Sequence, residues 1–218
     1  MRVVNPTVRC LAAVLLLLLG LPAWSAAQVR ISEVLAAPAS DWNGDGEVDY
    51  KNDEWVEIEN IGPQPAGLDG LYLKDATGDT YHYGFSGVLQ PGEVLLVTGS
   101  MAVEWQAVNG AGSSGLSLNN GGDTLELWRD VAEPRVLEVL DHLPIPSHAG
   151  GSDRALGRHP QNGEWVLFDG LNPYAGELLP PSTGCLPSPG TPNVCETVPL
   201  DEATWGLLKS FHLDLPPR

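Results

Sequence analysis

Short runs of alternating or apolar residues, separated by glycine and proline turns, constrain the fold of this chain more than any other feature. The 218 residues include 25 glycines and 19 prolines, and strand-like segments return about every 8–12 residues, as in β-sandwiches. No long helical pattern precedes residue 200, which disfavours an α/β fold. The sequence therefore predicts an all-β antiparallel sandwich, with strands at residues 29–35, 53–60, 68–74, 80–83, 94–98, 124–129, 136–141, 156–158 and 164–168.

Three segments carry more particular expectations. Residues 94–98 are continuously apolar and predict a central strand. Residues 101–108 can form one or two helical turns that the following glycines end. Residues 143–151 are rich in proline and glycine and predict a loop.

An acidic loop that bends at glycines runs from Asp41 to Asp49 and leads into the predicted strand at residues 53–60. Gly44 and Gly46 allow sharp turns within it. In the strand, Val56 and Ile58 alternate with polar or large residues on the other side, which are Trp55, Glu57 and Glu59. This period of two predicts a half-buried strand.

The loop also predicts a cation site. Asp41, Asn43, Asp45 and Gly46 occupy positions 1, 3, 5 and 6 of the calcium-loop pattern, with the Glu47 carbonyl at position 7 and Asp49 at position 9. Position 12 is Asn52 instead of a bidentate glutamate, and a strand rather than a helix follows, so an EF-hand is disfavoured. A calcium loop between strands remains, with a solvated acidic turn as the alternative. The candidate ligands are Asp41, Asn43, Asp45, Glu47, Asp49, Asp53 and Glu54.

The first 27 residues have the pattern of a secretory signal peptide. Arg2 and Arg9 precede or border an apolar run at residues 10–21, and the small residues 25–27 follow it. The run is shorter than the ~20 residues that cross a bilayer. We therefore expect cleavage after Ala27, export to the cell envelope or the extracellular space, and no transmembrane anchor in the mature chain.

Removal of residues 1–27 takes away two of the 11 basic residues and none of the 28 acidic residues, so the mature net charge is 9 − 28 = −19. Binding to nucleic acid through phosphates needs basic surface, and this charge disfavours it. It disfavours anionic membrane surfaces as well. The charge favours solubility and cation binding.

Two cysteines remain in the mature chain, Cys185 and Cys195. An even count in an exported protein predicts a disulfide. A zinc site would need two further ligands nearby, and the neighbouring sequence offers none.

The last 23 residues, 196–218, predict a separate tail with a short amphipathic helix. Asp201 can cap this helix, and Trp205, Leu208 and Phe211 then share one face. Such a short helix needs a surface to fold on. That surface is either the sandwich or a partner that recruits the chain.

Several pieces, taken in order, resemble the lamin tail domain family in its bacterial secreted form. The matching segments are residues 31–35, 41–46, 53–60, 68–75, 89–93, 116–125, 155–158 and 188–193. The resemblance implies an immunoglobulin-like antiparallel β-sandwich over residues 28–195, before the C-terminal helical tail. It also implies a binding or scaffolding module, and it supplies no catalytic residue. Trp55 stands where the family commonly has phenylalanine.

A hydrolase is the main alternative from another class. A Ser/His/Asp arrangement can be drawn from Asp141, His142, Ser147, His148, Ser152, Asp153 and His159. Loops collect these residue types in any case, and the sequence has no nucleophile elbow, no His-Glu-x-x-His and no phosphate-cradling loop. We therefore expect no catalytic residues.

Arg158 is expected to pair with a carboxylate, with an anionic ligand as the alternative.

These observations predict a secreted, non-catalytic module for binding, scaffolding or surface adhesion, stabilised by calcium. Its partner is a protein or a cell surface. The alternatives are an envelope hydrolase of unrecognised type and a subunit that its tail recruits to an extracellular assembly.

Overall fold

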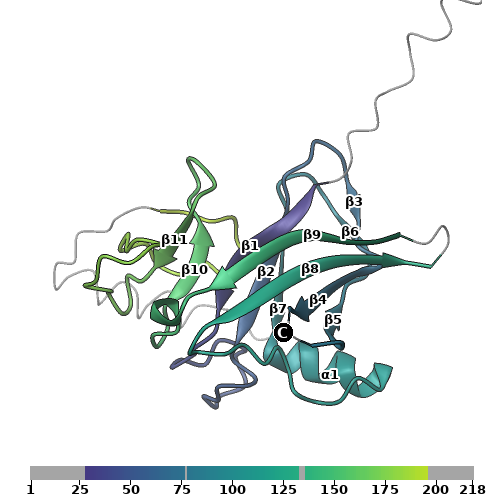
Figure 1. Ribbon diagram of the computed structural model, residues 1–218, viewed down its shortest axis with the longest axis horizontal. Coiled ribbons are helices and arrows are strands. Elements are labelled where there is room, and N and C mark those ends of the chain that lie inside the picture. The colour runs from purple at the N-terminus through teal and green to yellow at the C-terminus, as the bar shows by residue number, and fades with distance from the viewer. Residues whose placement is uncertain (1–27, 77, 133–135, 196–218) are drawn as a thin grey trace, which may run out of the picture.

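The structure is a computed structural model, and it describes residues 28–76, 78–132 and 136–195. The predicted signal peptide and the predicted C-terminal tail lie outside these residues, which Figure 1 draws in colour.

The described chain forms eleven strands and two helices. They are β1 Val29–Leu35, β2 Trp55–Asn60, β3 Ala66–Gly67, β4 Leu71–Asp75, β5 Tyr81–Gly84, β6 Val88–Leu89, β7 Val94–Thr98, α1 Gly99–Asn109, β8 Asp123–Val131, β9 Val136–Ile145, the 3₁₀ helix η2 Ser147–Ala149, β10 Ala155–Arg158 and β11 Trp165–Phe168. The side chain of Thr98 caps the start of α1, and Gly110 ends it in the left-handed conformation.

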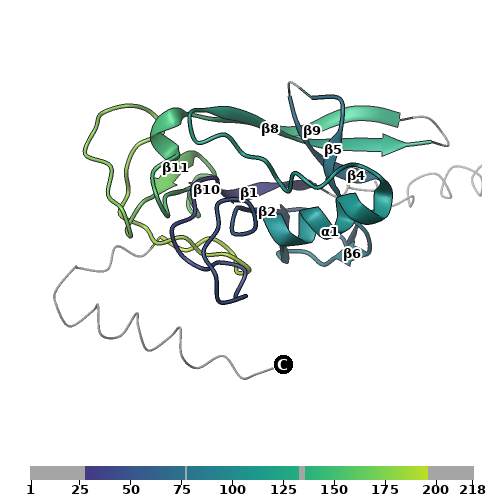
Figure 2. The same ribbon diagram turned by 90° about the horizontal axis from the view of Figure 1, so that it is seen from below.

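The strands form a five-stranded sheet in the order β11-β10-β1-β2-β7, a four-stranded sheet in the order β5-β4-β8-β9, and the small pair β3-β6. All pairings between these strands are antiparallel. Figure 2 shows the two larger sheets as separate layers, with β8 and β9 in one and β1, β2 and β10 in the other. The predicted all-β antiparallel sandwich is therefore confirmed.

The main core fills the space between the two sheets. The five-stranded sheet contributes Val56 and Ile58, and the four-stranded sheet contributes Leu73, Leu125 and Leu127. All five are at most 1 % exposed. Full burial of such a side chain contributes about 1.5–3 kcal/mol to the stability of the fold. The burial of these alternating strand residues therefore holds the two sheets together.

A second, smaller core covers the opposite face of the five-stranded sheet. It consists of buried Leu35, Trp55, Ala155, Val166, Phe168 and Cys185, with Trp42 and Cys195 packed against it. In Figure 2, the loop after β1 and the last described segment, which ends at Cys195, lie on this side of the sheet. The prediction that β2 is half-buried is therefore wrong, because distant segments cover its second face as well.

Two further expectations about strands were wrong. β7 lies at the edge of its sheet rather than at its centre. The helix α1 follows β7 in the chain and packs against it. β9 continues through Pro144 to Ile145, where a loop was expected. β9 is itself an edge strand, and a proline is tolerated there because one side of the strand needs no ladder bond.

Candidate functional site

The acidic loop between β1 and β2 is folded around the carboxylate of Asp41. This carboxylate accepts hydrogen bonds from the backbone N–H groups of Gly44, Asp45 and Gly46, at 2.7, 3.1 and 2.9 Å. Gly44 and Gly46 have φ angles of 77° and 91°, in the left-handed region that glycine adopts without strain. The sequence therefore bends the loop where the two glycines stand.

Asp53 holds the other end of the same loop. Its Oδ1 accepts the N–H groups of Trp42 and Asn43 at 2.8 and 3.0 Å, and its Oδ2 accepts the N–H of Asp49 at 2.8 Å. Asp53 is 1 % exposed. Its carboxylate is therefore a structural hub inside the loop.

Asp153 fixes the start of the loop from a distant part of the chain. It accepts hydrogen bonds from the backbone N–H groups of Ala39 and Ser40, from the Ser40 hydroxyl and from the indole N–H of Trp42, at 2.6–3.1 Å. The sequence indicates this residue only as a possible catalytic group, so its role in holding the loop is a finding of the structure.

The seven candidate metal ligands divide into two groups. Asp41, Asn43, Asp45, Glu47 and Asp49 are exposed or half-exposed on the loop, whereas Asp53 and Glu54 are buried. Across the described ranges, no group of three or more His, Cys, Asp or Glu side chains is placed to hold a metal ion. Calcium also accepts asparagine and backbone carbonyl oxygens, which lie outside that set, so calcium binding by the loop stays a prediction.

A polar pocket opens at one end of the sandwich, beside the acidic loop. Its volume is about 1050 Å³, near the upper end of the range for small-ligand sites. Its walls come from the end of the acidic loop, the ends of β4 and β9, the start of β8 and the segment between α1 and β8. The lining residues are Tyr50, Lys51, Glu54, Asp75, Ser114, Ser117, Leu118, Asn119, Gly122, Asp123, Thr124 and Ile145.

Glu54 is the buried acidic residue of this pocket. It is 3 % exposed, and its Oε2 accepts the backbone N–H of Leu118 at 3.2 Å. Burial raises the pKa of Glu54 to about 8 because it removes water from the charged form, and the negative charges of Asp123 and Asp49 add to the effect. No Lys, Arg or His in the described ranges forms an ion pair with it.

Two other buried glutamates, Glu33 and Glu57, bind a segment from the end of the described chain. Residues 188–193, which we name the strap, lie over them. The N–H and hydroxyl of Ser188 donate to Glu33, and the N–H of Gly190 donates to Glu57 at 2.8 Å. Burial raises the pKa of Glu33 to about 8 and that of Glu57 to about 7. These roles were not predicted, although a glutamate between apolar residues of the predicted strand at residues 29–35 was a usable signal.

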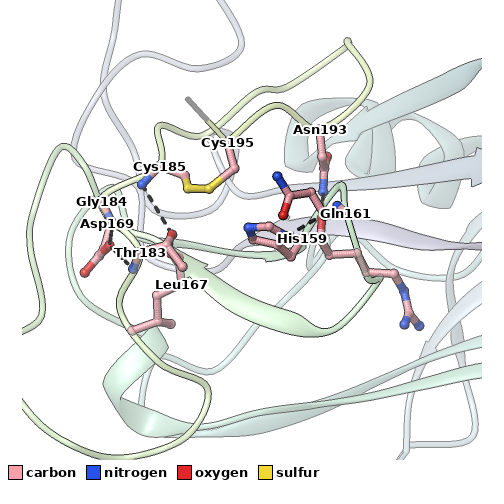
Figure 3. The surroundings of a disulfide bond; sticks show 10 residues. His159, Gln161, Leu167, Asp169, Thr183, Gly184, Cys185, Asn193 and Cys195 are labelled. Atoms are coloured by element: carbon pink, nitrogen blue, oxygen red, sulfur yellow. Dashed lines mark hydrogen bonds between the residues drawn. A yellow bond between two sulfur atoms is a disulfide. The ribbon is translucent and has the colours of Figure 1, made fainter. Parts of the chain in front are cut away.

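A disulfide between Cys185 and Cys195 closes the segment that contains the strap (Figure 3). Cys185 is buried in the second core, and its N–H donates to the Thr183 hydroxyl at 3.3 Å. The predicted disulfide is present, and its two sulfurs bind each other rather than a metal.

The proposed Ser/His/Asp residues do not assemble. His148 Nε2 lies 3.1 Å from the carbonyl oxygen of Pro180, and His159 Nδ1 accepts the N–H of Gln161. Asp141 binds Arg158, and Asp153 binds the acidic loop. In the part of the chain that the structure describes, no hydrogen bond joins the ring of His142, His148 or His159 to a serine or an aspartate.

Arg158 makes the structural ion pair that the sequence predicts. Its Nη2 lies 3.0 Å from Oδ2 of Asp141, and its Nε donates to the carbonyl of Ile31 at 2.9 Å. The guanidinium carbon lies 4.3 Å from the centre of the Trp165 ring. Arg158 therefore ties β10 to β1 and β9.

Among the described residues, no helix is long and apolar enough to cross a membrane. The two antiparallel sheets define the class of immunoglobulin-like β-sandwich domains. The family model described as Lamin Tail Domain matches residues 22–136, more than half of the 218 residues. The chain belongs to the lamin tail domain family. Comparisons with curated proteins and with solved structures found no match.

Proposed function

We propose that this chain is an exported, non-catalytic module that binds a protein or cell-surface partner through the end of the sandwich that carries the pocket and the acidic loop. The observation that carries the proposal is the polar pocket of about 1050 Å³, which the four-stranded sheet, the end of the acidic loop and the segment between α1 and β8 build together. The disulfide supports export, because such bonds persist in oxidising compartments. Family membership supports a binding or scaffolding role.

The binding role is tested with the mature chain, residues 28–218, immobilised and exposed to an envelope extract with and without calcium. We expect saturable capture of a discrete partner that free mature chain competes away. The contrary result is an absence of saturable capture combined with turnover of an ester, glycoside or nucleic acid that His148→Ala abolishes. That result would replace the binding module with the hydrolase alternative.

Calcium binding by the acidic loop is the finer part of the proposal. Its support is the alternating oxygen-bearing side chains of Asp41, Asn43, Asp45 and Asp49 on a loop already bent at Gly46. A ligand that binds only the folded state stabilises it by RT ln(1 + [L]/Kd), about 2.7 kcal/mol at a hundredfold excess over Kd. We therefore expect the melting temperature in millimolar calcium to exceed that in chelator by several degrees.

The matched variants for this measurement are Asp45→Ala, which removes a proposed ligand, and Glu177→Gln, which removes one exposed carboxylate outside the loop. Only Asp45→Ala is expected to abolish the difference. Identical melting curves in calcium and chelator for the unaltered chain would remove calcium from the proposal.

A further inference from the structure

We infer that the pocket beside the acidic loop receives a basic side chain, an arginine guanidinium or a lysine ammonium, from a partner polypeptide. This inference rests on the proposed function and names the chemistry of its binding site.

The charge of the pocket favours a cation. Glu54, Asp75 and Asp123 line it, and Lys51 is the single basic residue among its described lining residues. The whole chain carries a net charge of −17. A concave site lined by one sign of charge concentrates ligands of the other sign.

Glu54 supplies an independent reason, because it is a buried acid that forms no ion pair with a Lys, Arg or His of the described residues. A buried carboxylate is costly unless it is paired. The chain covers Glu33 and Glu57 with its own strap, but Glu54 instead lines an open cavity. A basic group entering the pocket would give Glu54 the ion-pair partner that the described residues do not supply.

Asp123 has acceptor capacity left for the same ligand. Its Oδ2 accepts the N–H of Asn119 at 2.8 Å and its Oδ1 accepts the N–H of Thr124 at 2.7 Å. An ionised carboxylate offers about four lone pairs, so both oxygens can accept again. A guanidinium, with its five donors in a planar fork, suits such acceptors.

The size of the pocket favours an organic cation over a bare metal ion. About 1050 Å³ is far larger than the space of one ion, and within the described ranges no His, Cys, Asp and Glu group is placed to hold a metal. A basic side chain with its neighbouring backbone fills such a volume better. The alkyl part of that side chain can lie along Leu118 and Ile145, which are the apolar parts of the lining.

The test is an NMR titration of the isotope-labelled mature chain with the blocked peptide acetyl-Gly-Arg-Gly-amide. We expect saturating shifts at the amides of Ser117, Leu118 and Thr124. The same peptide with citrulline, which is isosteric and uncharged, is expected to bind at least tenfold more weakly. If the arginine peptide causes no saturating shift, or if the citrulline peptide binds equally well, the inference is overturned by this experiment alone.

Variants locate the site. Glu54→Gln and Asp123→Asn are each expected to weaken binding at least tenfold, and Glu177→Gln, an exposed acid outside the pocket, is expected to leave it unchanged. Folding of each variant is checked by the spectrum of the unbound protein. Equal weakening by Glu177→Gln would reduce the effect to overall charge and overturn the inference.

Spermidine is the last ligand to be compared in the titration, because it carries the same ammonium groups on a free small molecule. Weaker binding of spermidine than of the peptide supports a partner side chain, and tighter binding would overturn that assignment. If the arginine peptide does not bind while the Glu54→Gln variant still captures the partner, only the assignment of a basic side chain to the pocket is wrong. If capture itself is absent, the proposed function fails.

Discussion

Single carboxylates determine the conformation of the acidic loop. Asp53 is buried and gathers three backbone N–H groups, from Trp42, Asn43 and Asp49. A carboxylate can do this because both of its oxygens only accept hydrogen bonds. The residue that looked like a metal ligand in sequence therefore already has its partners within the chain.

We expect Asp53→Asn to destabilise the protein by about 1–3 kcal/mol. The amide nitrogen of asparagine is a donor, so at least one buried N–H of the loop would lose its acceptor. Urea unfolding of the variant measures the change. Glu47→Gln, an exposed change in the same loop, is the control and should stay within ±0.5 kcal/mol. A neutral Asp53→Asn would show that the hub contributes little.

The buried glutamates predict an unusual dependence of stability on pH. The pKa of Glu33 rises from 4.5 to about 8 and that of Glu57 from 4.5 to about 7, chiefly because burial disfavours the charged form. Their contribution to stability is therefore fully present below about pH 4.5 and is lost as pH rises towards 8. The free energy of unfolding should increase when pH is lowered from 8.5 to 5.5.

The size of this increase is on the order of a few kcal/mol, since one pKa unit corresponds to about 1.4 kcal/mol. The measurement is urea unfolding at several pH values. Glu33→Gln should make the curve less steep, because an amide does not titrate, while Glu54 and Glu57 still do. Asp49 acts in the opposite direction: a backbone hydrogen bond from Asn52 lowers its pKa, so its contribution is lost only at more acidic pH. A stability that falls steadily from pH 8.5 to 5.5 would contradict the prediction.

Among the elements, the strap joins distant parts of the chain. It binds β1 through Glu33 and β2 through Glu57, and the amide of Asn193 donates to the carbonyls of Ser32 and Arg158. These contacts explain how a short segment without regular structure covers the second face of the five-stranded sheet.

The disulfide should strengthen this cover. We expect exported protein to contain oxidised Cys185 and Cys195, so alkylation without reductant adds no label to the intact mass. The double change to serine should cost about 2–3 kcal/mol by the loop-entropy model. Neither the double serine variant nor the reduced, unaltered chain contains the disulfide. The two should therefore unfold at similar urea concentrations. Two labels on unreduced protein would contradict the prediction.

On the scale of the whole molecule, the family match at residues 22–136 covers less of the chain than the folded unit does. β10, β11 and the strap follow residue 136 and complete the five-stranded sheet and its cover. The lamin tail domain of this chain therefore depends on contacts between its first and last described segments.

The tail, residues 196–218, is predicted to dock on a surface rather than to fold alone. Its apolar residues Trp205, Leu208 and Phe211 would share one helical face. Hydrogen exchange on the isolated mature monomer is the measurement. Slow exchange at residues 205–211 indicates docking on the sandwich and ends the recruitment hypothesis. Fast exchange there, beside a protected sandwich, supports recruitment, which deletion of residues 197–218 should then abolish.

The sequence by itself determined the class of fold and the approximate position of the longer strands, because alternation of side chains and the turns at glycine and proline are local properties. β1 and β7 have the predicted bounds, and the Cys185–Cys195 pairing follows from the count of cysteines. Strand order was not predictable in this way: β7 lies at an edge although its residues are apolar.

Only the tertiary structure decided which acids are exposed and which are buried. In sequence, Asp45 and Asp53 look alike, yet one points to solvent and the other is enclosed by the loop. The pocket around Glu54 depends on residues 75, 114–124 and 145, which are distant in sequence. The physical reason is that burial, and with it the pKa of Glu33, Glu54 and Glu57, depends on what packs above a side chain. Those neighbours come from parts of the chain that local sequence patterns do not connect.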